Sequence, residues 1–195
     1  MKFIFDFDDV LFNNTKQFKP HMYVCLEKAG VPRTVSEEYY KEAREKEFSL
    51  KNFITILLAH DPLSLKFQRG KEKVEEVYEE IMRECKNFIN VQLTEMVKKL
   101  GRNNCFIVTN GEKQFQEDKI KNSGIASLFS EIYIVPNSKK EIIYDICNGN
   151  KNEKIIFIED KIKFIEDLDF KKCPNLKIIL YDEQGLEKLK AEIGQ

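Results

Sequence analysis

Short hydrophobic runs alternate with segments of helical periodicity along most of the chain. Five runs have the length and the β-branched or aromatic content of buried strands, at residues 3–5, 105–108, 131–135, 154–158 and 176–180. Amphipathic patterns around the last four runs predict helices over 93–100, 113–122, 139–147, 161–168 and 183–193. Strands and helices that alternate in this way form a parallel sheet covered on both faces, with right-handed crossovers. The pattern therefore predicts an α/β protein with a doubly wound five-stranded parallel sheet.

The segment between the first two runs is helical throughout. We expect helices over 17–29, 37–47, 50–60 and 71–86, the second opened by a capping box of Thr34 and Glu37. The fourth carries a stripe at helical spacing that predicts a core-facing side: Val74, Val77, Tyr78, Ile81 and Met82. The chain is thus predicted to divide into an α/β core, residues 1–15 and 91–195, and a small α-helical cap, residues 16–90. The cap emerges beside the end of the first strand, where it can act as a lid.

Three carboxylates follow the first strand directly: Asp6, Asp8 and Asp9. Carboxylates this close repel one another, and a hard cation such as Mg²⁺ is the usual compensation, because no His or Cys lies nearby. Ligands bind at the carboxyl ends of strands in open parallel sheets. Asp6 and Asp8 could there act as nucleophile and as proton donor and acceptor. Taken alone, the three are equally well explained as solvated turn residues.

Two later strands end in groups that suit an anion. Thr109, Asn110 and Gly111 offer a hydroxyl, an amide and backbone N–H groups that a ligand can approach. Lys139 and Lys140 stand at a helix N-terminus, where the helix dipole disfavours cations unless an anion is shared. Each group has a simpler explanation, a turn in the first case and two solvated lysines in the second.

A further acidic pair, Glu159 and Asp160, ends the fourth strand and again suits a cation, although Asp160 could simply cap the next helix. Each of these signals is modest by itself. Four of them in order, each at the end of a buried strand, point to one site at this edge of the sheet.

The ordered set resembles the haloacid dehalogenase-like (HAD) hydrolase superfamily. Its four motifs match here at residues 6–10, Thr109, Lys139 or Lys140, and the pair Glu159 and Asp160. The resemblance spans the whole core and implies a Rossmann-like sheet, while residues 16–90 are similar to the family's helical cap in position and helicity.

The resemblance also implies a mechanism. Asp6 would attack phosphorus and form an aspartyl-phosphate, and Asp8 would protonate the leaving oxygen and then activate water. Mg²⁺ would be held by Asp6, the backbone carbonyl of Asp8, and Asp160. Thr109 and Lys139 would bind the phosphoryl oxygens.

Some assignments remain open. Lys139 fits the family's Lys-x-Glu helix opening better than Lys140, since Glu141 follows it. Asp160 is favoured over Glu159 as the metal ligand. Asp9 stands where glycine is common in the family and adds negative charge near the phosphate site.

The resemblance favours a Mg²⁺-dependent phosphatase that acts on a small phosphomonoester. Dehalogenases and P-type ATPases of the superfamily lack an Asp at the position of Asp8, whereas phosphatases and phosphomutases keep it. The first alternative is a phosphomutase acting on a sugar phosphate. The second is a non-catalytic phosphate-sensing or scaffold protein, which would not need an acid–base residue.

Composition and charge limit the classes of molecule that this protein is expected to bind. The chain of 195 residues is 42% hydrophobic and 33% charged, with a net charge of −1 and both signs interspersed, which argues against nucleic-acid or membrane binding. We see no membrane-spanning run and no secretory leader. The five cysteines lack metal-ligand spacing, so we expect reduced, packed thiols. These features predict a cytoplasmic enzyme whose partner is a small phosphorylated metabolite; they do not predict its oligomeric state.

Overall fold

The computed structural model describes residues 1–44, 48–59 and 70–194. The strands are β1 (Lys2–Phe5), β2 (Cys105–Asn110), β3 (Glu131–Val135), β4 (Ile155–Glu159) and β5 (Leu176–Leu180). They form one sheet in the order β3-β2-β1-β4-β5, and every neighbouring pair is parallel. Phe5 at the end of β1 lies beside Ile107 and Ile158. The predicted α/β class and five-stranded parallel sheet are confirmed.

The sheet is buried on both faces because successive side chains of a strand point to opposite sides. Phe3 and Phe5 belong to one hydrophobic cluster, together with Ile107. Ile4 and Phe157 belong to a second cluster on the other side. This double burial explains why the strands appear in the sequence as continuous hydrophobic runs rather than as alternating ones.

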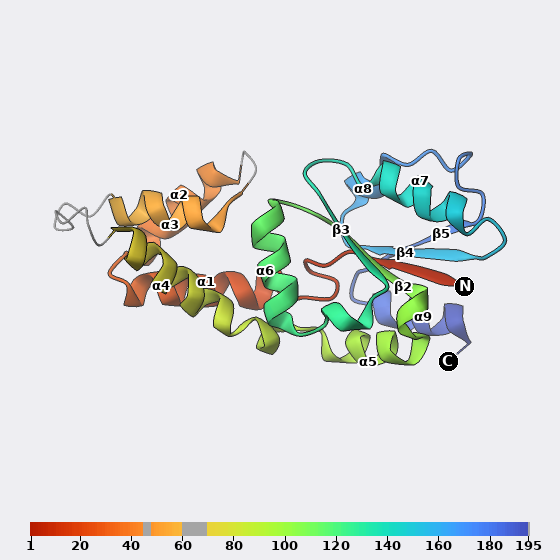
Figure 1. The fold of residues 1–195 in the computed structure, drawn as a ribbon, viewed down its shortest axis with the longest axis horizontal. Coiled ribbons are helices and arrows are strands. Elements are labelled where there is room, and N and C mark those ends of the chain that lie inside the picture. Colours follow the sequence, from red (N-terminus) through yellow and green to blue (C-terminus); the bar gives the residue numbers. More distant parts are fainter. Residues whose placement is uncertain (45–47, 60–69, 195) are drawn as a thin grey trace.

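Helices cover both faces of the sheet (Figure 1). They are α5 (Val91–Leu100), α6 (Lys113–Ser123), α7 (Lys140–Gly149), α8 (Ile162–Glu166) and α9 (Gly185–Ile193). Helices α7 and α8 lie on one side and α5 and α9 on the other, which makes the sheet doubly wound. Helix α8 is shorter than the predicted 161–168, because Leu168 N donates to Ile165 O in a tighter turn at its end.

Between the loop after β1 and the start of α5, the described residues form the helices that we call the insert helices: α1 (Lys19–Lys28), α2 (Arg33–Ala43), α3 (Leu50–Ala59) and α4 (Gly70–Arg83). A π-helical turn, η1 (Asn14–Phe18), precedes them and a 3₁₀ turn, η3 (Cys85–Phe88), follows. They lie at one end of the molecule, beyond α6 (Figure 1). The predicted stripe on α4 is buried, as expected. The exact division into core and cap stays a prediction.

The capping box predicted at Thr34 and Glu37 is wrong. Helix α2 begins at Arg33, directly after Pro32, whose fixed φ of −58° and extended ψ of 139° place the helix start there. Thr34 therefore lies inside the helix, and Glu37 pairs with Arg33 at 2.8 Å instead. The predicted ends of the second and third helices, residues 47 and 60, lie outside the described residues.

The chain leaves the insert helices close to where it entered them. Asn13 N donates to Phe88 O at 2.7 Å, and Asn90 N donates to Leu11 O at 2.8 Å. The Asn90 side chain also caps α5 and donates to Val10 O at 3.1 Å. The loop that carries Asp6 and Asp8 is thus fastened to the returning chain.

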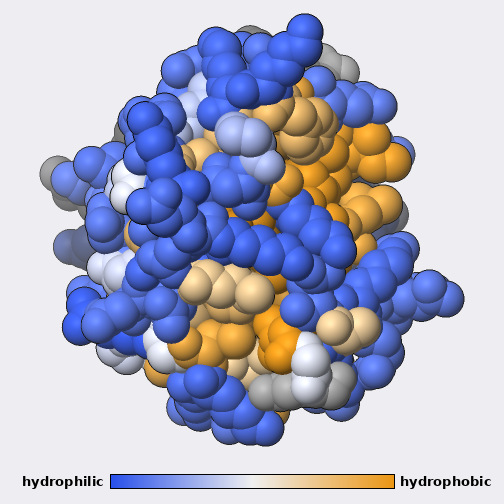
Figure 2. Space-filling model, turned by 90° about the vertical axis from the view of Figure 1, so that its right-hand side faces the viewer, coloured by the Kyte–Doolittle hydropathy of each residue, from blue (hydrophilic) through white to orange (hydrophobic). Residues whose placement is uncertain are grey.

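The surface is mainly polar. From the end of the molecule opposite the insert helices, hydrophilic side chains cover most of the visible face and hydrophobic ones appear between them (Figure 2). The five cysteines are free and buried, as predicted. No helix among the described residues has the length and apolar character that crossing a membrane would require.

Candidate functional site

Asp6, Lys139 and Glu159 meet at the end of the central strands. Asp6 follows β1, Lys139 precedes α7, and Glu159 ends β4. The Lys139 ammonium nitrogen lies 2.7 Å from Asp6 Oδ1 and 2.6 Å from Glu159 Oε2. All three side chains are at most 3% exposed. Because they are removed from water, the ammonium group and the two carboxylates must compensate one another's charge.

Burial and charge act in opposite directions on these carboxyl groups. Burial would raise the pKa of Asp6, but Lys139 and Lys161 outweigh it and hold the pKa of Asp6 below its usual value. Burial and the neighbouring Asp6 raise the pKa of Glu159 to about 8, against the pull of Lys139. Burial likewise raises the pKa of Asp160. Asp6 is therefore the one of the three whose pKa is held below its usual value, which favours the ionised form that can act as a nucleophile.

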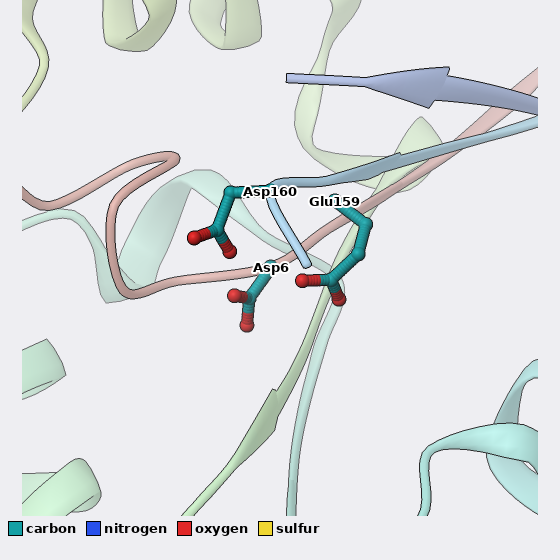
Figure 3. Close-up of side chains that lie close together, drawn as sticks. All are labelled: Asp6, Glu159 and Asp160. Carbon is teal, nitrogen blue, oxygen red and sulfur yellow. The ribbon is translucent and has the colours of Figure 1, made fainter. Parts of the chain in front are cut away.

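The same place suits a hard cation. Asp6, Glu159 and Asp160 lie side by side (Figure 3), each offering a carboxylate oxygen within 4.8 Å of the others. Among the described residues, the buried Oδ1 atoms of Asp6 and Asp160 accept no hydrogen bond, even though Lys139 lies close to the first. Lys161 Nζ likewise lies 3.6 Å from Asp160 Oδ1 without forming a hydrogen bond. Buried oxygens that accept no hydrogen bond, in a set of three carboxylates, fit Mg²⁺.

Glu159 has other partners. Its Oε2 accepts from Lys139 at 2.6 Å, and its Oε1 accepts from the Lys161 backbone N–H at 3.0 Å. The contacts therefore favour Asp160 over Glu159 as the second cation ligand beside Asp6. Glu159 instead orients Lys139 toward Asp6.

Asp8 is bound by a different lysine. Lys119 Nζ lies 2.5 Å and 2.8 Å from the two carboxylate oxygens of Asp8, and Gln116 Nε2 donates to Asp8 Oδ2 at 3.0 Å. Both partners come from α6. The same Gln116 amide group lies 3.4 Å from Thr109 Oγ1, the buried hydroxyl near the end of β2. The Asp8 carboxylate is thus outside the cation cluster, and only its backbone carbonyl remains as the predicted metal ligand.

Two groups that were expected to face an anion are used within the protein. Asn110 Nδ2 donates to Val135 O at 3.1 Å and to Asn137 O at 2.8 Å, which ties β2 to the loop that leads to Lys139. The Gly111 backbone N–H donates to Val135 O at 3.0 Å. Both residues line the cavity described below, but these N–H groups are already engaged.

The neighbouring charges also find partners. Lys140 Nζ lies 3.5 Å from Asp167, away from Asp6, so the geometry favours Lys139 as the lysine of the third motif. Asp9 adopts a left-handed φ of 63° and uses both carboxylate oxygens to accept from the backbone N–H and hydroxyl of Thr15. Its negative charge closes the turn after β1.

A cavity of about 670 Å³ lies over the site. Its lining on the sheet side includes the predicted site residues Asp6, Asp8, Thr109 and Lys139. Its lining on the side of the insert helices includes Lys19, Tyr40, Arg44 and Phe48. Three of the four parts of the chain that the sequence pattern singled out therefore line one space that is large enough for a small metabolite, and Lys161, which directly follows the fourth part, lines it as well.

Sequence reasoning missed Lys119, Gln116 and Lys161. The first two lie on the buried face of α6 with Phe115, Ile120 and Ser123, at helical spacing. The sequence did contain a signal for these two residues: they are polar at positions where the helical pattern predicts apolar side chains. Lys161 follows the acidic pair directly; burial would lower its pKa, but Asp6 and Asp160 outweigh that and raise it.

Comparison with protein families identifies the family to which this chain belongs. The family model of haloacid dehalogenase-like hydrolases matches residues 3–168, which include all four motifs. The chain therefore belongs to the haloacid dehalogenase-like hydrolase family. No curated protein matches the sequence.

Solved structures of different activities share the fold. A 2-haloacid dehalogenase from Pseudomonas syringae pv. Tomato DC3000 has a TM-score of 0.60 and 13% identity, covering 95% of this chain and 88% of the other. A protein from Thermotoga maritima, provisionally identified as a β-phosphoglucomutase, has a TM-score of 0.61 and 15% identity, covering 98% and 99%. YfnB from Bacillus subtilis, bound to magnesium, has a TM-score of 0.60 and 14% identity, covering 100% and 98%. At these identities the likeness establishes the fold alone, so the reaction must be argued from the side chains.

Proposed function

We propose that this protein is a Mg²⁺-dependent phosphatase that hydrolyses a small phosphomonoester. The observation that carries the proposal is that Asp6 and Asp8 line one cavity with Thr109 and Lys139. Two carboxylates with different partners can take different roles, one as nucleophile and one in proton transfer. A haloalkane substrate has no leaving oxygen to protonate, so Asp8 supports phosphoryl chemistry.

In the proposed reaction, an Asp6 carboxylate oxygen attacks phosphorus, and the bond from phosphorus to the leaving oxygen breaks. Asp8 in its acid form gives its proton to that oxygen, and an aspartyl-phosphate remains. Asp8, now a carboxylate, takes a proton from a water molecule that attacks the phosphorus, which releases inorganic phosphate and restores Asp6. Thr109 and Lys139 bind the phosphoryl oxygens while their charge builds up.

Asp6, Asp160 and the Asp8 backbone carbonyl would hold Mg²⁺, which when bound neutralises repulsion between the Asp6 carboxylate and the phosphate. The cluster of three carboxylates and the buried oxygens of Asp6 and Asp160 support this assignment. The magnesium bound to YfnB is consistent with it.

The first experiment measures phosphate release from 4-nitrophenyl phosphate with and without Mg²⁺, for the wild type and for Asp6→Asn. We expect activity that requires Mg²⁺ and falls by about four orders of magnitude or more in Asp6→Asn, because the nucleophile is lost. Asp145→Asn, an exposed acid on α7, is the matched control and should keep wild-type activity. A folded wild type that is inert on this substrate and on a panel of phosphomonoesters would contradict the proposal.

A phosphomutase is the second candidate, because side chains of the insert helices wall the cavity and could exclude water from a phosphoenzyme. Incubation of a sugar 1-phosphate and analysis for its 6-phosphate isomer separates the two activities. A phosphatase releases inorganic phosphate and forms no isomer.

A further inference from the structure

We propose that Lys119 and Gln116 are positioning residues that hold the Asp8 carboxylate in place for proton transfer and link it to Thr109. This role rests on the proposed function, since it concerns the step in which Asp8 protonates the leaving oxygen. The two residues lie on consecutive turns of α6, and neither belongs to the four sequence motifs.

Three contacts fix the orientation of the Asp8 carboxylate. Lys119 Nζ contacts both of its oxygens, at 2.5 Å and 2.8 Å, and Gln116 Nε2 contacts one of them at 3.0 Å. A carboxylate held by a single donor can still rotate, whereas one held on both oxygens and by a second donor cannot do so without losing charge-assisted hydrogen bonds. Asp8 is thereby held in the wall of the cavity that Asp6 also lines.

The surroundings of Lys119 leave Asp8 as its charge partner. The Lys119 side chain is 1% exposed, and its ammonium group lies 4.6 Å from the ring centre of Phe115 and 5.6 Å from those of Phe7 and Phe12. Among the described residues, Asp8 is the carboxylate with which Lys119 forms an ion pair. A lysine buried among aromatic rings needs such a partner, so the two groups hold each other in place.

Gln116 connects Asp8 to the phosphate-binding hydroxyl. Its Nε2 group also donates to Asn110 O at 2.9 Å and lies 3.4 Å from Thr109 Oγ1. One amide group therefore sets the positions of the proton-transfer residue and of the end of β2 together. A shift of the Gln116 side chain would move both relative to Asp6.

The test compares substrates that differ in their need for a proton. The leaving group of 4-nitrophenyl phosphate departs readily as an anion, whereas that of phenyl phosphate, which has nearly the same shape, depends more on protonation. For Lys119→Met we expect kcat/KM to fall on phenyl phosphate by about tenfold to a hundredfold more than on 4-nitrophenyl phosphate, since general acid catalysis is the function disturbed. Lys119→Arg should restore part of the difference.

Two comparisons distinguish the positioning of Asp8 by Lys119 from other effects of the Lys119→Met substitution. In an Asp8→Asn background, adding Lys119→Met should leave the ratio of the two substrates unchanged, because the residue being positioned is already gone. Lys121→Met, at an exposed lysine on the same helix, is the matched control and should match the wild type on both substrates. If Lys119→Met does not fold, Gln116→Leu should shift the ratio in the same direction.

Equal losses on both substrates would overturn the proposal, as would a full Lys119→Met effect in the Asp8→Asn background. Either outcome would mean that Lys119 has a purely structural role, and the proposed phosphatase function would be unaffected. A wild type that hydrolyses neither substrate would instead defeat the proposed function itself, and this role with it.

Discussion

Gly111 has no side chain, and the space that this leaves is occupied by the side chain of Gln116. The φ of Gly111 is +150°, a conformation that other residues rarely adopt, and a Cβ there would lie 3.0 Å from Gln116 Nε2 and 3.1 Å from Gln116 Cγ. The glycine therefore makes room for the side chain that contacts Asp8. From the sequence we expected the Thr109-Asn110-Gly111 segment to present backbone N–H groups to an anion; the contacts show that Gly111 accommodates Gln116.

Gly111→Ala should displace Gln116 and weaken the hold on Asp8. We expect a loss of roughly 1 to 3 kcal/mol in the free energy of unfolding, because of backbone strain, together with lower activity on phenyl phosphate. Chemical denaturation and kcat/KM measure the two effects.

Gly149→Ala is the matched control for this change. Apart from its chain neighbours and the backbone of its own helix, no atom of the described residues lies within 4 Å of a Cβ at that position, so the variant should be as stable as the wild type or slightly more stable. Wild-type activity and stability in Gly111→Ala would show that Gln116 does not depend on this space.

At the scale of elements, α6 links the insert helices to the sheet. It lies between them (Figure 1). Tyr78 on α4 donates a hydrogen bond from its hydroxyl to Asp118 Oδ2 on α6 at 2.6 Å. Phe48, just before α3, packs against Phe115 of α6 with ring centres 5.8 Å apart. The same helix thus carries Lys119 and Gln116, which contact Asp8, and residues that contact the insert helices and the segment before α3.

Tyr78→Phe should lower the free energy of unfolding by roughly 1 to 3 kcal/mol near neutral pH, because a hydrogen bond to a charged group is lost. Burial and the bond to Asp118 raise the pKa of Tyr78 above its usual value of 10.0. The stability that this hydrogen bond contributes is fully present below the pKa that tyrosine has in the unfolded chain. It decreases as the pH rises from that value toward the higher pKa of Tyr78 in the folded protein.

The difference between wild type and Tyr78→Phe should therefore be largest near pH 8 and shrink as the pH rises past 10. Guanidinium denaturation of both proteins at several pH values measures it. A difference that is the same at pH 8 and at pH 10.5 would mean that the Tyr78 hydroxyl titrates alike in the folded and unfolded chains.

At the scale of the whole molecule, the cavity is formed by two parts of the chain. The sheet side would supply the groups for the proposed phosphoryl transfer, and the part of the chain that holds the insert helices contributes Lys19, Tyr40 and Arg44 to the lining. Lys19 Nζ lies 4.3 Å from the Tyr40 ring centre, and the Arg44 guanidinium carbon lies 6.0 Å from it. Cations in a cavity wall attract an anionic substrate and can contact the part of it that lies beyond the phosphate.

Arg44→Ala should raise KM for the best phosphomonoester by about tenfold, equivalent to about 1.4 kcal/mol of binding, with little change in kcat. Its cation is remote from the reacting groups, so its contribution should be the same in the bound substrate and in the transition state. Lys41→Ala, at an exposed cation on α2, which ends directly before Arg44, is the control and should leave KM unchanged. A fall in kcat with constant KM would contradict this role.

The sequence by itself determined the α/β sheet, the places where its strands end and the acidic, hydroxyl and lysine groups found there, because periodicity and strand ends are local properties of the chain. The tertiary structure decided which of these groups meet. It favours Lys139 over Lys140 and Asp160 over Glu159, and it brings Lys119 to Asp8 across 111 positions of sequence. These choices depend on the packing of α6 and α7 against the strand ends. A local pattern can show which face of an element is buried, but which side chains from distant elements meet is settled only once the elements pack.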